Sequence, residues 1–214
     1  MPLDFFRRSR TDANGAETEV ITVVSGLPRS GTSMMMRMLD AGGIPVLVDQ
    51  QRQADQSNPK GYYEFEQVKQ MREGDNQWVK AAQGKAVKII SPLLEYLPGD
   101  YRYRIVFMQR DLKEILASQR EMLLRRGEAA SQVSDRAMAE LYQKHLDKIA
   151  AWLATQPNVS VLYLNYNQVM EDPQTYIHHL VDFFHPRLLA ANRMLAVIET
   201  SLYRQRADRV GPAA

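Results

Sequence analysis

Short apolar segments alternate with longer amphipathic segments along most of the chain. The apolar segments are rich in β-branched residues and are predicted as strands: residues 20–24, 85–90, 104–108 and 159–164. The amphipathic segments are predicted as helices: residues 32–39, 64–82, 111–126, 131–155 and 172–184. This alternation predicts an α/β fold with a mostly parallel central sheet and helices on both faces.

The length of the chain, 214 residues, suits a single domain. Residues 1–18 are polar and contain the turn signal Asn14-Gly15, so they are predicted as a flexible N-terminal tail. The α/β domain is expected over residues 19–206, with a C-terminal tail at 207–214.

Composition narrows the class of protein. Hydrophobic residues make up 45% of the chain and charged residues 24%, which argues against disorder. The net charge is only +2 without a dense basic face, so a nucleic-acid partner is not expected. The absence of cysteine excludes disulfides, thiolate metal sites and cysteine nucleophiles. Neither a signal peptide nor an apolar run of about 20 residues is evident, so we expect a cytoplasmic protein without a membrane partner.

The loop between the first predicted strand and helix reads Gly26-Leu-Pro-Arg-Ser-Gly-Thr-Ser33. Glycines allow close backbone approach, so successive N–H groups and the helix N-terminus can cradle an anion. Arg29 adds a planar cation, and Thr32 and Ser33 add hydroxyl donors. The spacing is that of a P-loop, but Thr32 stands where an ATPase has its lysine. The alternative is a tight turn whose hydroxyls only cap the helix.

A second phosphate-binding pair is suggested at the end of a later strand. Arg110 follows the strand at 104–108, and Ser118 lies eight residues further on, two turns along the next helix. The two side chains could bind one phosphate from two sides. The alternative is that Arg110 pairs with Asp111 or another acid.

These motifs resemble those of the sulfotransferase family. Pro28–Ser33 looks like the family's 5′-phosphosulfate motif, and Arg110 with Ser118 resembles its 3′-phosphate motif. Residues 161–173 are similar to the late strand and turn in which the tyrosine matching Tyr166 contacts adenine. The resemblance implies a P-loop nucleotide-binding fold and the donor 3′-phosphoadenosine 5′-phosphosulfate, with adenosine 3′,5′-bisphosphate as product. It further implies donor binding by the loop and these three residues: Arg29, Ser30, Gly31, Thr32, Ser33, Arg110, Ser118 and Tyr166.

The catalytic groups are harder to assign. Ile90 stands where the cytosolic branch of the family has its catalytic histidine. The late Arg-Lys-Gly segment of that branch is also missing. Residues 202–206 offer substitute cations. Some members use a glutamate after the first helix, which favours Glu64 as the base, ahead of Glu66 and Asp49. Glu64 could instead be an early-helix acid favoured by the dipole.

Cations near the bridging oxygen would stabilise the leaving group, and Arg29 and Lys88 are expected there. The histidines lie in segments predicted away from the strand ends: His145, His178, His179 and His185. The resemblance thus implies a sulfotransferase, which we expect to act on a hydroxyl or amine of a small molecule or glycan, without a metal. The alternatives are a P-loop kinase or nucleotide hydrolase, and a non-catalytic nucleotide-binding module. A homo-oligomer is left open.

Overall fold

The sheet has four parallel strands and one antiparallel edge strand. A computed structural model describes residues 6–7, 19–49, 61–125, 127 and 133–199. The strand order across the sheet is β1-β5-β4-β2-β3, with β2 central to the parallel part. The strands are β1 (Phe6–Arg7), β2 (Ile21–Gly26), β3 (Ala86–Lys88), β4 (Tyr103–Gln109) and β5 (Val159–Asn165). The predicted α/β class and the mostly parallel sheet are confirmed.

The edge strand β1 was not expected. It pairs antiparallel with β5, with Phe6 opposite Leu162 and Arg7 opposite Val161. These two residues fall within the segment predicted as a flexible tail, and they pair with β5 in the structure. The other residues of the segment, and those of the predicted C-terminal tail, lie outside the described part of the chain.

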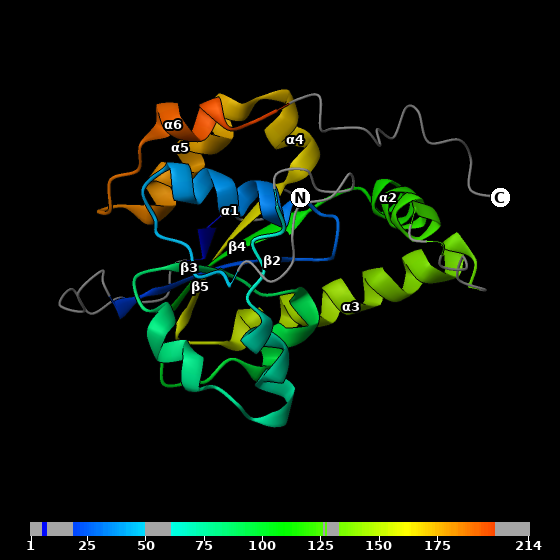
Figure 1. Cartoon of the computed structure of the whole chain (residues 1–214), viewed down its shortest axis with the longest axis horizontal. Coiled ribbons are helices and arrows are strands. Elements are labelled where there is room, and N and C mark those ends of the chain that lie inside the picture. The colour runs from blue at the N-terminus through cyan, green and yellow to red at the C-terminus, as the bar shows by residue number, and fades with distance from the viewer. Residues whose placement is uncertain (1–5, 8–18, 50–60, 126, 128–132, 200–214) are drawn as a thin grey trace.

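Helices cover both faces of the sheet (Figure 1). One face carries α1 (Thr32–Ala41), α4 (Tyr166–Glu171), α5 (Pro173–Phe184) and α6 (Ala191–Ala196). The other carries α3 (Asp135–Thr155) and the 3-10 helices η2 (Glu66–Glu73), η3 (Gln77–Ala82) and η4 (Ser91–Tyr96). Alternation along the strands explains the two layers: in β4, Val106 and Met108 pack toward α1, whereas Ile105 and Phe107 pack toward α3.

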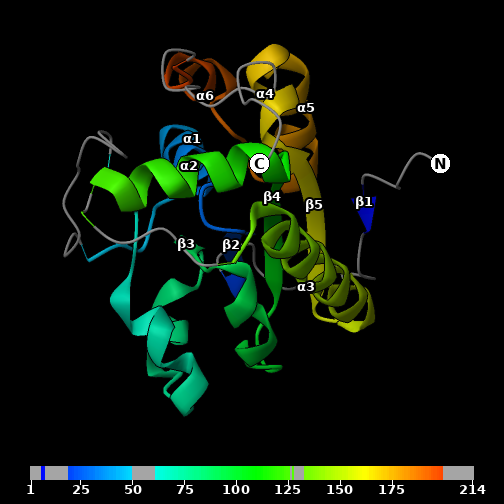
Figure 2. The ribbon, with the colours of Figure 1, turned by 90° about the vertical axis from the view of Figure 1, so that its right-hand side faces the viewer.

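The parallel register brings the carboxyl ends of the strands to one edge. Val24 pairs with Lys88, Gly26 with Met108, and Gln109 with Asn165. The loop after β2, Arg110 after β4 and Tyr166 after β5 therefore emerge side by side, where parallel α/β sheets bind their ligands. The remaining helix, α2 (Leu112–Arg125), starts just beyond β4 and packs against α3 (Figure 2).

The predicted helix at 64–82 is instead two 3-10 helices, η2 and η3, separated by residues 74–76. In η2 the buried residues are Val68 and Met71, three apart, and in η3 Val79 and Ala82 repeat that spacing. A spacing of three suits the 3-10 helix, in which residues i and i+3 share one side. Helices α4 and α6 were not predicted, and each has only six residues. Tyr166 consequently opens a helix rather than ending a strand.

Candidate functional site

The loop after β2 packs closely against Tyr166. Gly31 precedes α1 with a φ of 96°, and a Cβ at this position would lie 2.4 Å from Tyr166 Cδ2. Both the backbone conformation and the close approach require glycine. The tyrosine is 6% exposed, and burial raises the pKa of its hydroxyl, against the lowering effect of Arg110. The ring thus forms a fixed wall beside the loop.

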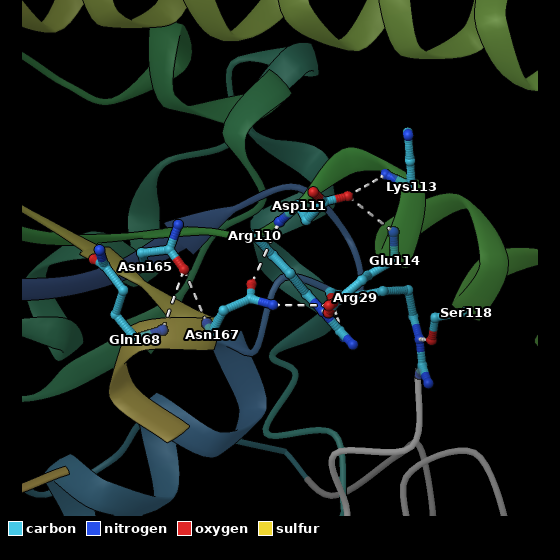
Figure 3. Close-up of polar contacts among 9 residues, drawn as sticks. All are labelled: Arg29, Arg110, Asp111, Lys113, Glu114, Ser118, Asn165, Asn167 and Gln168. Atoms are coloured by element: carbon cyan, nitrogen blue, oxygen red, sulfur yellow. Dashed lines mark hydrogen bonds and ion pairs between the residues drawn. The ribbon is translucent and has the colours of Figure 1, made fainter. Parts of the chain in front are cut away.

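Arg29 joins the loop to the helix after β4. Its Nε donates to Ser118 Oγ at 2.9 Å, and its carbonyl accepts from Arg110 Nη1 at 3.0 Å (Figure 3). Its φ of 72° is unusual for a residue with a side chain, and such a conformation costs about 1–2 kcal/mol. Residues from the two predicted phosphate motifs therefore meet in the structure: the Arg29 side chain contacts Ser118, and Arg110 contacts the Arg29 backbone.

Arg110 is held on several sides. Its Nε forms an ion pair with Glu114 Oε2 at 2.8 Å, and its guanidinium carbon lies 4.6 Å from the centre of the Tyr166 ring. The pairing with an acid that was an alternative for Arg110 is real, but the acid is Glu114 rather than Asp111. The pairing does not remove Arg110 from the site, because the same guanidinium contacts the loop backbone.

Two hydroxyls near the loop have no hydrogen-bond partner among the residues described. They belong to Ser25 in β2 and Ser30 in the loop, which are 0% and 1% exposed. An unsatisfied buried hydroxyl costs about 1–3 kcal/mol, so a ligand with acceptor oxygens would relieve it. The N-terminus of α1 also favours negative charge. The loop therefore fits a phosphate or sulfate group.

A second cluster, joined through the Tyr62 carbonyl, links the loop to the predicted catalytic residues. Ser33 Oγ donates to the Tyr62 carbonyl at 3.1 Å, and Lys88 Nζ donates to the same oxygen. Lys88, 8% exposed at the end of β3, also pairs with Glu64 Oε1 at 3.6 Å. Glu64 and Lys88 are thus adjacent and connected to the start of α1.

The two other candidate acids are engaged elsewhere. Asp49 Oδ2 accepts from the Glu66 backbone N–H at 2.6 Å, and the Glu66 carboxylate pairs with Lys69 at 2.6 Å. Among Asp49, Glu64 and Glu66, Glu64 is therefore the acid that reaches the buried lysine. The cations at 202–206 lie outside the described residues.

His145 was expected away from the strand ends, and this expectation is wrong. Its Nε2 lies 2.8 Å from Oγ of Ser91, three residues after the end of β3. Burial lowers the pKa of His145, and Ser91 is fully buried. His145 lies in α3 and Ser91 in η4, and the packing of α3 against η4 brings the two side chains together. The two residues are 54 positions apart in the chain. Ile90, which the sequence resemblance places where the cytosolic branch has its catalytic histidine, is 38% exposed.

The described residues show neither a cluster of metal-binding side chains nor a membrane-spanning helix. No group of three or more His, Cys, Asp or Glu side chains in the described ranges is arranged to hold a metal ion. The helices described also include none with the length and apolar character needed to span a bilayer.

The chain is similar to known proteins in both sequence and structure. Residues 21–205 match the sulfotransferase domain family. A sulfotransferase from Mycobacterium tuberculosis has a similar structure, with a TM-score of 0.57 at 16% identity over 90% of this chain and 75% of that chain. A mouse sulfotransferase complexed with PAP gives a TM-score of 0.53 at 16% identity, over 84% of this chain.

The chain spans 62% of the mouse protein's length. At these identities the structural likeness supports the fold, and a comparison with curated proteins found no significant match. The family match covers most of the chain, including both phosphate motifs and the Tyr166 segment. The chain therefore belongs to the sulfotransferase family.

Proposed function

We propose that this protein transfers a sulfuryl group from 3′-phosphoadenosine 5′-phosphosulfate to a hydroxyl, or an amine, of a small-molecule or glycan acceptor. The observation that carries the proposal is the meeting of Arg29, Arg110 and Ser118 beside the loop after β2. Two arginines in contact at one edge of the sheet suit a ligand with two separated anionic groups. The PAP complex of the mouse relative is in keeping with such a ligand.

The donor would be held from three sides. The loop and the start of α1 would bind the 5′-phosphosulfate, Arg110 and Ser118 the 3′-phosphate, and Tyr166 the adenine. The loop residues assigned to this role are Arg29, Ser30, Gly31, Thr32 and Ser33. Support comes from the buried Ser30 hydroxyl, which has no partner in the part of the chain that the structure describes, and from the contact between Arg29 and Ser118. In the structure the Ser33 hydroxyl donates to the Tyr62 carbonyl, so Ser33 would have to break this hydrogen bond before it could donate to the nucleotide.

The reaction requires one proton acceptor and charge stabilisation. The bound donor supplies a sulfuryl group on a good leaving group, the 5′-phosphate of the nucleotide. In the proposed step Glu64 takes the acceptor proton while the new O–S bond forms. Arg29 and Lys88 stabilise the charge that develops on the bridging oxygen as the old S–O bond breaks. The 3.6 Å separation of Lys88 and Glu64 supports these paired roles. A sulfuryl group carries less negative charge than a phosphoryl group, so the proposal includes no metal.

Calorimetric titration with adenosine 3′,5′-bisphosphate, and separately with ATP and Mg²⁺, tests the ligand class. We expect tight binding of the bisphosphate and none of ATP. The reverse pattern would favour a kinase or hydrolase and overturn the proposal. Sulfate transfer to a panel of phenols, alcohols, amines and glycans then separates an enzyme from a binding module, which would bind the nucleotide but label no acceptor. The cytoplasmic location stays a prediction.

A further inference from the structure

Glu114 is a fully buried carboxylate beside the proposed donor site. It lies in the first turn of α2 and is 0% exposed. A buried carboxylate is strongly unfavourable unless donors satisfy it. Its two oxygens have separate partners: Oε2 accepts from Arg110 Nε and Oε1 from Asn167 Nδ2, each at 2.8 Å (Figure 3).

The contact with Arg110 fixes the orientation of the guanidinium. The group is planar, so an anchor at Nε sets the direction of the opposite nitrogens. With Nε held by Glu114, Nη1 reaches the Arg29 carbonyl at 3.0 Å, and the plane lies over the Tyr166 ring. An arginine without this anchor could adopt many rotamers, and ordering it on ligand binding would reduce affinity.

The contact with Asn167 ties the same carboxylate to α4. Asn167 directly follows Tyr166, and its backbone N–H is capped by Asn165 Oδ1 at 2.9 Å. Glu114 therefore connects the arginine proposed for the 3′-phosphate with the helix that carries the tyrosine proposed for the adenine. These groups come from two different strand ends, and neither motif includes Glu114.

A purely stabilising role explains the arrangement less well. A buried ion pair contributes little net stability compared with packed apolar side chains, because desolvation offsets the attraction. A fixed cation is, however, what a phosphate site needs, since the arginine is then oriented before the ligand arrives.

We propose that Glu114 is a positioning residue that sets the preference for a nucleotide with a 3′-phosphate, by holding Arg110 against Tyr166 and the loop. The inference rests on the proposed function, because it assumes that Arg110 binds that phosphate. In this proposal Glu114 acts through Arg110 and does not contact the ligand. It predicts a selective effect: loss of Glu114 should weaken binding of adenosine 3′,5′-bisphosphate much more than binding of 5′-AMP, which lacks the 3′-phosphate.

The test compares Glu114→Gln with the wild type in calorimetric titrations of the two nucleotides. The amide keeps the shape but lacks the charge, and its NH₂ group would face one of the two donors. We expect affinity for the bisphosphate to fall at least about tenfold, as for loss of a charged hydrogen bond, while affinity for 5′-AMP changes by less than about threefold. Glu121→Gln is the matched control, because Glu121 forms an i,i+4 pair with Arg125 on the same helix and is much more exposed. It should leave both affinities unchanged.

A second variant, Glu114→Asp, keeps the charge but is one methylene shorter, so it should lose part of the preference; it carries the test if Glu114→Gln does not fold. A wild type that shows no preference for the bisphosphate would overturn the proposed function itself. A wild-type preference that survives in Glu114→Gln would overturn only the role of Glu114. Equal loss of both affinities, or failure of both variants to fold, would assign Glu114 to the fold and would also overturn the inference.

Discussion

Replacement of Gly31 by alanine should disturb the site through one identifiable contact. The added Cβ would lie 2.4 Å from Tyr166 Cδ2 and 3.1 Å from Cε2, distances at which either the loop or the ring must move. The ring cannot shift alone, because it is buried and the Arg110 guanidinium lies over it at 4.6 Å. The change should therefore affect both stability and nucleotide binding.

The magnitude has two parts. An alanine at a φ of 96° costs about 1–2 kcal/mol in backbone strain. Overpacking against the ring adds about 1–3 kcal/mol. Gly43→Ala isolates the first part, because Gly43 has a φ of 99° and its added Cβ would meet no atom within 4 Å. The effect of alanine on the unfolded chain is similar at both positions.

Urea-induced unfolding of the two variants measures the difference. We expect the free energy of unfolding to fall by about 1–3 kcal/mol more in Gly31→Ala than in Gly43→Ala. Calorimetry should show weakened binding of adenosine 3′,5′-bisphosphate in Gly31→Ala and unchanged binding in Gly43→Ala. Equal destabilisation of the two variants, with nucleotide affinity retained in both, would refute the argument that the Tyr166 ring is a fixed wall of the site.

Three other changes test separate parts of the structure. Arg29→Ala removes the bond to Ser118 and a charge from the loop, so it should abolish calorimetric binding of the bisphosphate; normal affinity would contradict its role. Glu64→Gln should keep that affinity but slow transfer in single-turnover assays at least about 100-fold, and an unchanged rate would exclude Glu64 as the base. Burial lowers the pKa of His145, so the unfolded chain binds this proton first. Stability should then decrease as the pH falls below about 6.5 toward the lower folded-state pKa, a decrease that His145→Gln should diminish in urea titrations.

Local pattern was sufficient for the elements that frame the site. The β-branched run at 20–24 and the amphipathic run at 32–39 correspond to β2 and α1, and Gly31 between them has a positive φ of 96°. Asp172-Pro173 likewise opens α5, where the Asp172 side chain caps the helix by accepting from the Thr175 backbone N–H. Such features depend on a few neighbouring residues, and those residues are adjacent in the chain.

The short elements escaped prediction for a related reason. Helix α4 follows β5 without a connecting loop, and its six residues are too few to show a helical period. Over the eight residues of η2 and the six of η3, the amphipathic pattern of a 3-10 helix is the same as that of an α-helix. Packing against the sheet, rather than propensity, selects between these forms.

The polar contacts of the site depend on distant parts of the chain. Sequence motifs indicated that Arg29, Arg110 and Ser118 act together, but the asparagine that Glu114 reaches was not identified, and neither was the serine that His145 reaches. Strand order and register bring Ser118 to Arg29 and Asn167 to Glu114, 89 and 53 positions apart, whereas the packing of α3 against η4 brings His145 to Ser91. Hydrophobic periodicity records which face of an element is buried, but not which element will cover it, so the partners of these side chains emerge only when the layers pack.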